Sequence, residues 1–295
     1  GAWYDLRRAE GKLSVAEDVL ELTKEHLQHV EALFRNGVTA KNEVLRVQVS
    51  VSEAELNRIR AENAVAVGWK ALERAVGVPL FGNFTLPPRE ENPQVALVPP
   101  DAVSVGLARR PEMEALGLAA RSASLASKAA EAQGGPQIAL VGEVYAADER
   151  FFPQKQNDWK ATLLASWSFF DGGASSARAR EAGAAAEEFL FQMEDMKRQI
   201  ELEISVARLN CESSQQRIVA GRAMVESAEE DYRMALRRYT ARVGTNIDVL
   251  DARVALSNAR NQLVESVYDA LKARTEMEFA MGTIGSGKAT EEQRK

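Results

Sequence analysis

The sequence predicts a mainly α-helical protein, built from long antiparallel coiled-coil helical hairpins with an internal two-fold repeat and one amphipathic β-hairpin. Three observations support this prediction. Apolar residues recur at steps of three and four over long stretches, the sequence resembles itself at one fixed offset, and a single segment alternates in polarity with period two. The first pattern is typical of helices that pack along a coiled-coil seam.

The repeat is seen when the sequence is shifted by 205 positions, which aligns residues 2–77 with residues 207–282 without a gap. Apolar residues then fall on apolar residues, as with Leu13 on Ile218 and Leu27 on Tyr232. Because chance rarely preserves such a match over this length, we expect both copies to share one fold.

Residues 1–77 are predicted to form the first helical hairpin. Its first helix has a near-heptad apolar stripe, made of Leu13, Ala16, Leu20, Thr23, Leu27, Val30 and Phe34. Gly37 ends this helix, because glycine readily adopts the left-handed conformation of a helix C-cap. Thr39 is expected to cap a second helix, which Gly77 and Pro79 end.

Residues 171–282 are predicted to repeat this plan around a turn at residues 241–246. The helix from about Ser175 to Thr240 would be roughly 100 Å long, which suits a tube or rod. It begins well before the position that matches Gly1, so the first repeat is expected to start in mid-helix, with an N-terminal section before it. Residues 283–295 are polar and are predicted to be a disordered tail.

Two segments join the repeats to a β-hairpin. Residues 78–100 contain six of the nine prolines and are predicted to be a non-helical connector. Residues 101–136 are predicted to be an ascending helix. Pro111 suits a first helical turn, Glu112 favours the positive end of the helix dipole, and Gly134 helps to end the helix.

Residues 137–170 are predicted to form the β-hairpin, with strands at 137–145 and 158–169. One face of the second strand is wholly apolar, with tryptophans near both ends: Trp159, Ala161, Leu163, Ala165, Trp167 and Phe169. A half-buried strand of a soluble sheet gives this alternation, and so does a membrane-barrel strand with aromatic residues at the interfaces. Two strands cannot close a barrel, so the membrane interpretation requires further strands.

The composition argues against several classes of function. The 37 Lys and Arg residues against 43 Asp and Glu residues give a net charge of −6, which argues against nucleic-acid binding. A single cysteine excludes an internal disulfide and a cysteine-based metal site. His26 and His29 are the only histidines, and two ligands without a nearby third predict no metal site. The sequence therefore predicts neither an enzyme nor a cofactor.

Several motifs resemble those of the TolC-type outer-membrane efflux proteins. Residues 238–252, RYTARVGTNIDVLDA, resemble the family's helical tip motif. Trp159 with residues 166–173, SWSFFDGG, resembles its strand-to-helix junction. Residues 110–113 (RPEM) and 136–142 (PQIALVG) are similar to the entry of its second half. The resemblance covers residues 2–282, nearly the whole chain.

This resemblance implies an outer-membrane channel that is the exit duct of a tripartite efflux pump or a type I secretion system. A homotrimer would place its β-hairpins as a barrel in outer-membrane lipid and its helices as an α-barrel across the periplasm of a Gram-negative-type bacterium. A periplasmic adaptor and an inner-membrane pump would be its partners. The alternative is a periplasmic coiled-coil adaptor or scaffold, which would be expected to carry Gly-rich β-domains beside a single helical hairpin.

The resemblance also implies site residues. Asp248 and Asp251, three apart on one helical face, match the channel's acidic gate, whereas the residues alone suggest a solvated face near a helix N-terminus. Glu43 and Tyr239 match latch positions between helices, although Gly244 stands where the family has a latch arginine. The adaptor-contacting tips would be Gly37, Val38, Thr39, Arg242, Val243 and Gly244. The membrane-interface residues would be Trp159, Trp167 and Phe169.

Overall fold

The computed structural model describes residues 1–80, 99–146 and 157–284, which divide into two compact units. The first unit combines residues 1–102 with the chain from residue 203 onward, and the second comprises residues 103–202. Most of the predicted connector, the tip of the predicted β-hairpin and the predicted disordered tail from residue 285 lie outside the described residues.

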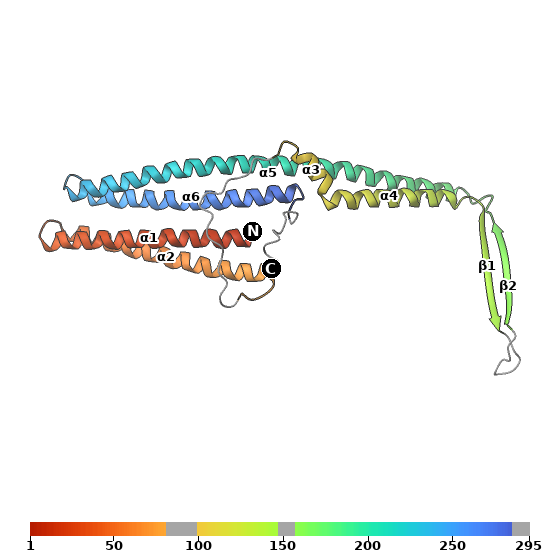
Figure 1. Cartoon of the computed structure of the whole chain (residues 1–295), viewed down its shortest axis with the longest axis horizontal. Helices are drawn as coiled ribbons and strands as arrows, with labels where there is room; N and C mark the ends of the chain where they lie inside the picture. Colours follow the sequence, from red (N-terminus) through yellow and green to blue (C-terminus); the bar gives the residue numbers. More distant parts are fainter. Residues whose placement is uncertain (81–98, 147–156, 285–295) are drawn as a thin grey trace, which may run out of the picture. The chain divides into compact units, whose positions relative to one another are not determined.

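Long helices build the first unit. Helices α1 (Ala2–Arg35) and α2 (Lys41–Val76) form one antiparallel hairpin, and α5 (Ala174–Thr240) with α6 (Asn246–Ala280) forms the other. The part of α5 up to Leu202 belongs to the second unit, and the remainder packs against α6 in the first. Figure 1 shows the two hairpins lying side by side, with their turns at the same end.

The turns at residues 36–40 and 241–245, here called the first and second tip turns, share one backbone pattern. In the first, Val38 N–H donates to Leu33 C=O and Gly37 N–H donates to Phe34 C=O, both at 2.9 Å. In the second, Val243 donates to Arg238 and Arg242 to Tyr239, also at 2.9 Å. These bonds define a Schellman motif, which satisfies the last carbonyls of each helix. The repeat therefore extends to individual hydrogen bonds.

The capping of the two hairpins differs from the sequence prediction. The N-cap of α2 is Ala40, not Thr39, and no side chain caps this helix. By contrast, Thr245 caps α6 in a full capping box with Asp248. Gly244 is required by close approach, because an added Cβ would lie 3.0 Å from the Arg238 Cβ.

Replacing Arg242 with glycine is expected to stabilise the protein. Arg242 has φ 63° where the first repeat has Gly37 at 69°, and the left-handed conformation costs a non-glycine residue about 1–2 kcal/mol. Part of this gain is offset by the greater unfolded-state entropy of glycine, so the free energy of unfolding should rise by about 0.5–1 kcal/mol. Thermal unfolding measures the change.

Gly37→Ala is the matched control for that substitution. Nothing lies within 4 Å of a Cβ added at Gly37, so its cost is purely conformational and should be about 1 kcal/mol. A lower melting temperature for Arg242→Gly would mean that contacts of the arginine side chain outweigh its backbone strain.

Apolar contacts join the two repeats as well as the helices within each. Val264 of α6 packs on the cluster that Val15 and Val19 form on α1. In return, Leu22 of α1 packs on the cluster that contains Tyr232 and Val249. Each of these clusters therefore takes a side chain from the other hairpin, and the two hairpins pack against one another.

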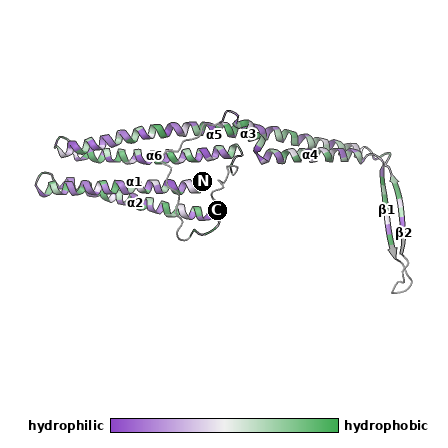
Figure 2. Ribbon diagram, in the orientation of Figure 1, coloured by the Kyte–Doolittle hydropathy of each residue, from purple (hydrophilic) through white to green (hydrophobic). Residues whose placement is uncertain are grey.

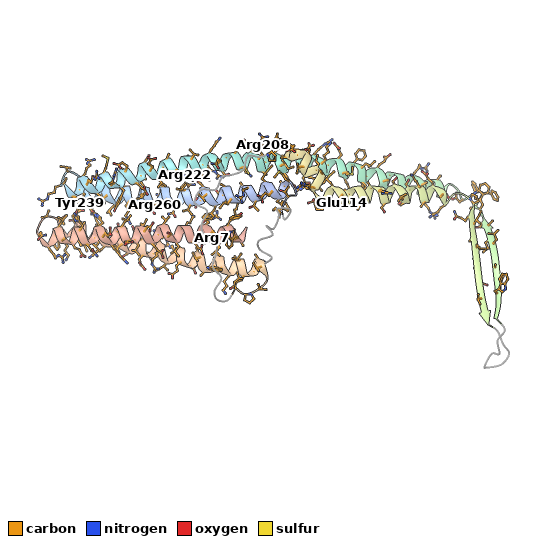
Figure 3. The ribbon with its side chains drawn as sticks, in the orientation of Figure 1. Arg7, Glu114, Arg208, Arg222, Tyr239 and Arg260 are labelled. Carbon is orange, nitrogen blue, oxygen red and sulfur yellow. The ribbon has the colours of Figure 1, made fainter. Side chains whose placement is uncertain are left out.

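Polar contacts follow the antiparallel line where α1 meets α6. From the open end toward the tips they are Tyr4–Thr275, Asp5–Lys272, Arg8–Asp269, Lys12–Glu265, Asp18–Arg260, Thr23–Arg253 and His26–Asn246. Arg260, labelled in Figure 3, also pairs with Glu229 of α5 at 2.7 Å. Partly exposed ion pairs contribute about 0–1 kcal/mol each, so the two buried contacts nearest the tips matter most for this junction.

The second unit holds the remaining elements. They are α3 (Ala102–Arg109), α4 (Pro111–Ala132), β1 (Gln137–Ala146), β2 (Asn157–Ser166) and the first part of α5. The predicted ascending helix at residues 101–136 is divided into α3 and α4, and Pro111 stands in the first turn of α4 as expected. Arg110 has an extended conformation (φ −73°, ψ 125°) as the N-cap of α4, because a residue before proline disfavours the helical region.

Strands β1 and β2 pair antiparallel, with Leu140 opposite Leu163 and Val144 opposite Trp159. Figure 2 shows hydrophobic colouring predominating on the strands, whereas the helices mix both colours. Within the described residues, no helix has the length and apolar character needed to cross a bilayer.

Candidate functional site

Asp248 lies at the third position of α6 and has a structural role. Its carboxylate accepts a hydrogen bond from Thr245 N–H at 2.9 Å, and its own N–H donates to Thr245 Oγ1 at 3.2 Å. These bonds lower the pKa of Asp248, and the Arg238 guanidinium lowers it further. The carboxylate is therefore ionised at neutral pH while it caps the helix.

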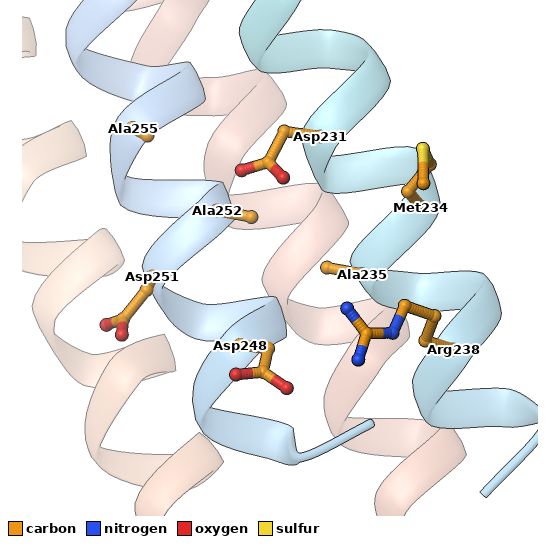
Figure 4. A pocket seen from close by; sticks show the side chains of 8 residues that line it. All are labelled: Asp231, Met234, Ala235, Arg238, Asp248, Asp251, Ala252 and Ala255. Carbon is orange, nitrogen blue, oxygen red and sulfur yellow. The ribbon is translucent and has the colours of Figure 1, made fainter. Parts of the chain in front are cut away.

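Asp248 and Asp251 line a groove between α5 and α6, together with Asp231, Met234, Ala235, Arg238, Ala252 and Ala255. In Figure 4 the carboxylates of Asp231 and Asp248 lie between the two helices, whereas that of Asp251 points to the side of α6 away from Arg238. The structure thus brings the two predicted gate residues to one groove and adds a third carboxylate, Asp231, from the facing helix.

The two residues of the candidate latch, Glu43 and Tyr239, are not bonded to one another in the described structure. Glu43 Oε2 instead accepts a hydrogen bond from Asn246 Nδ2 at 2.9 Å. The Tyr239 ring packs edge-on against His26 and His29, with centroids 5.5 and 6.2 Å away. Burial raises the pKa of the Tyr239 hydroxyl, and the charge on Glu43 adds to that rise.

Asn246 is the functional residue that sequence reasoning missed. It is 3% exposed and joins α6 to both helices of the first repeat, through Glu43 on α2 and His26 on α1. Arg253, 7% exposed and bonded to Thr23 at 2.6 Å, was missed as well. The repeat offers a signal for both, because its offset places asparagine and arginine of α6 on lysine and glutamine of α2.

The predicted adaptor-contacting residues lie in the two tip turns. Val38 is 40% exposed and Val243 is 69% exposed, although both are apolar. Apolar side chains that remain exposed at the end of a hairpin are available for contact with a partner.

The β-hairpin has two chemically distinct faces. Leu140, Val144, Trp159 and Leu163 share one face with Ile138, Gly142, Ala161 and Ala165, so this face is apolar over its four pairs from Ile138–Ala165 to Val144–Trp159. These large side chains are 71–79% exposed. Glu143 and Lys160 lie opposite one another on the other face, so only one face suits hydrocarbon.

Trp167 and Phe169 lie outside the strand, contrary to the prediction that it runs to residue 169. β2 ends at Ser166, and the Trp167 indole N–H donates to the Gly134 carbonyl at 3.2 Å. The two rings contact one another with centroids 4.5 Å apart. The indole bond turns the chain toward the end of α4, which the residue pattern alone does not reveal.

We find no set of side chains suited to bind a metal ion among residues 1–80, 99–146 and 157–284. No group of three or more His, Cys, Asp or Glu side chains in these ranges could hold an ion. The Nε2 atom of His26 is hydrogen-bonded to Asn246. Cys211 is buried, and its Sγ lies 3.3 Å from the Ala273 carbonyl oxygen.

Comparison with curated proteins finds relatives among export components. The alkaline protease secretion protein AprF of Pseudomonas aeruginosa is 26% identical over 92% of this chain. The probable efflux pump outer membrane protein TtgC of Pseudomonas putida is 21% identical over 95% of the chain. The chain spans 59% of the length of each of these relatives.

Solved channels share the fold. VceC of Vibrio cholerae, an outer membrane protein, superposes with a TM-score of 0.79 over 95% of this chain and 68% of its own, at 20% identity. The open state of the Neisseria gonorrhoeae MtrE outer membrane channel gives a TM-score of 0.83, also at 20% identity, over 95% of this chain and 64% of its own. The family model for outer membrane efflux proteins matches residues 102–283. This chain therefore belongs to the outer membrane efflux protein family.

Proposed function

We propose that the chain forms part of an outer-membrane channel, the exit duct of a tripartite efflux pump or a type I secretion system. The observation that carries the proposal is the combination of two duplicated helical hairpins with a β-hairpin that exposes an apolar face over residues 138–144 and 159–165. Family membership supports the same function. The duct lies in the outer membrane and periplasm, and it is a passive conduit that needs neither catalysis nor a cofactor.

The duct is a homotrimer in this proposal. Helix α2 supports it, because large apolar side chains stay about half exposed at helical spacing: Leu45, Val49, Leu56 and Ile59. Such a stripe is an unfilled coiled-coil seam, which a neighbouring chain would cover. The apolar face of the β-hairpin would then contact outer-membrane lipid, with Trp159 at an interface and Trp167 and Phe169 beside the strand end.

In this proposal the two tip turns contact the periplasmic adaptor. The first tip turn presents Val38 and the second presents Val243, and both would contact a periplasmic adaptor that joins the duct to an inner-membrane pump. Just inside the tips, Asp248 and Asp251 would form the gate. Glu43, through its hydrogen bond from Asn246, and Tyr239, through its ring contact with His26, would hold it closed.

Complementation tests the proposal. The full-length protein should restore export to a strain that lacks its own outer-membrane channel but keeps the adaptor and pump. Restored protease secretion would indicate a secretion channel, as the name of AprF describes. Restored resistance to small toxic solutes would indicate an efflux channel, as the name of TtgC describes. A trimer that reaches the outer membrane yet restores neither, and conducts no ions in planar bilayers, would refute the duct.

The double variant Val38→Asp, Val243→Asp separates conduction from docking. Charged side chains should abolish the apolar contact with the adaptor, so export is expected to fall by at least about tenfold, as for loss of 1.4 kcal/mol of binding energy. Conductance of the purified channel should stay unchanged. Export at the wild-type level would show that the tips do not contact the adaptor.

A further inference from the structure

The start of α6 is fastened to both helices of the first repeat by a chain of buried polar groups. Asn246 Nδ2 donates to Glu43, so its Oδ1 faces His26 Nε2 at 2.7 Å and must accept from it. His26 is only 4% exposed. The ring therefore carries a proton on Nε2 in this arrangement.

The other ring nitrogen of His26, Nδ1, has no hydrogen-bond acceptor beside it within the described residues. Nδ1 is buried and makes no hydrogen bond within the described residues. Protonation would add a second N–H there without an acceptor, and it would place a full charge in a site shielded from water. A buried donor without a partner and a buried charge both oppose the packed state.

The groups around the ring come from every element that packs against it. They are His29 on α1, Glu43 on α2, Tyr239 on α5 and Arg253 on α6. Burial lowers the pKa of His26, the charges of His29 and Arg253 lower it further, and the Asn246 hydrogen bond opposes them. Glu43 is the one anion among these groups, and its carboxylate is engaged by Asn246.

We propose that His26 is a proton-sensitive lock between the two helical hairpins. As a neutral ring it holds the start of α6 against α1, and its protonation releases the tip of the α5–α6 hairpin from the α1–α2 hairpin. Because the folded, locked state favours the neutral ring, the lock is strongest above the ordinary histidine pKa of about 6.5. It weakens as the pH falls below that value. Only the consequence for passage through the duct rests on the proposed function.

Distances between the tips test the lock without any transport. Spin labels on Val38→Cys and Val243→Cys in the full-length, purified protein should report one short intrachain distance at pH 8. Between pH 6.5 and pH 5 a longer distance should gain population, by up to about tenfold per pH unit for a single proton. A distance distribution that does not change over this range would overturn the proposal.

Variants identify the titrating group. His26→Gln keeps an amide donor for Asn246 without titrating, so its tips should stay together at pH 5. His26→Arg stays charged throughout this pH range and should show the longer distance even at pH 8. His29→Gln is the matched control: its tips should still separate in acid, at a pH no lower than in the wild type, because the charge of His29 lowers the pKa of His26. An unchanged pH profile in His26→Gln would refute the assignment.

Asn246→Asp combined with Glu43→Gln is a second test that does not depend on how His26 variants fold. The new amide at residue 43 can donate to the new carboxylate, so the contact with α2 is kept. A carboxylate beside His26 favours the protonated ring in the locked state, so acid should no longer separate the tips. Separation with the wild-type profile would also refute the lock. Because none of these measurements uses conduction, a failed lock and a failed duct give different results.

Discussion

Replacing Asp248 and Asp251 with asparagine is expected to remove the cation preference of the channel and its block by multivalent cations. In the proposed trimer both residues follow the second tip turn, so three chains would gather six carboxylates round one mouth. Carboxylates gathered at one mouth attract a multivalent cation together, although salt screens part of that attraction. Blocker affinity should therefore fall sharply in single-channel recordings.

Asparagine is the appropriate substitute because Asp248 also caps α6. Its side-chain oxygen can still accept from the Thr245 N–H, so the capping box should survive, whereas alanine would remove that hydrogen bond. Glu226→Gln, which removes one exposed carboxylate from α5, is the control and should leave selectivity unchanged. If the double variant keeps the wild-type selectivity and blocker affinity, the two aspartates are only a solvated face with a helix cap.

Replacing Leu163 with arginine is expected to prevent assembly in the outer membrane. Leu163 is 71% exposed on the apolar face of the hairpin and lies opposite Leu140 in mid-strand. An arginine facing lipid near the bilayer centre costs about 2–4 kcal/mol, and a trimer would incur this cost three times. Heat-stable trimers in outer-membrane fractions should fall to near background.

Thr162→Arg is the matched control for this substitution. Thr162 directly precedes Leu163 in β2 and faces the other side of the hairpin, which already carries Glu143 and Lys160. A polar lumen tolerates an arginine there, so trimers should form normally. Spin labels at residues 163 and 165 should report lipid, and water contact at these positions would contradict the membrane assignment.

The candidate site was predicted from the sequence only in part. The tip turns and Asp248 follow from local chemistry, because a Schellman turn and a capping box use residues within a few positions of each other. Asn246 and Arg253 did not stand out, since an asparagine or arginine in an amphipathic helix is usually on the solvent side. Their burial depends on His26 and Thr23, more than 200 residues earlier in the chain.

What the sequence determined by itself is the set of elements and their duplication. Heptad spacing indicates which face of a helix packs, and period-two alternation indicates which residues of a strand share a face. Tertiary structure alone decided that α1 lies against α6, that Trp167 leaves the strand to bond Gly134, and that Arg242 accepts a left-handed backbone. The physical reason is that a periodic pattern reports one apolar face, whereas a buried polar contact is favourable only when both partners, distant in the chain, are brought together.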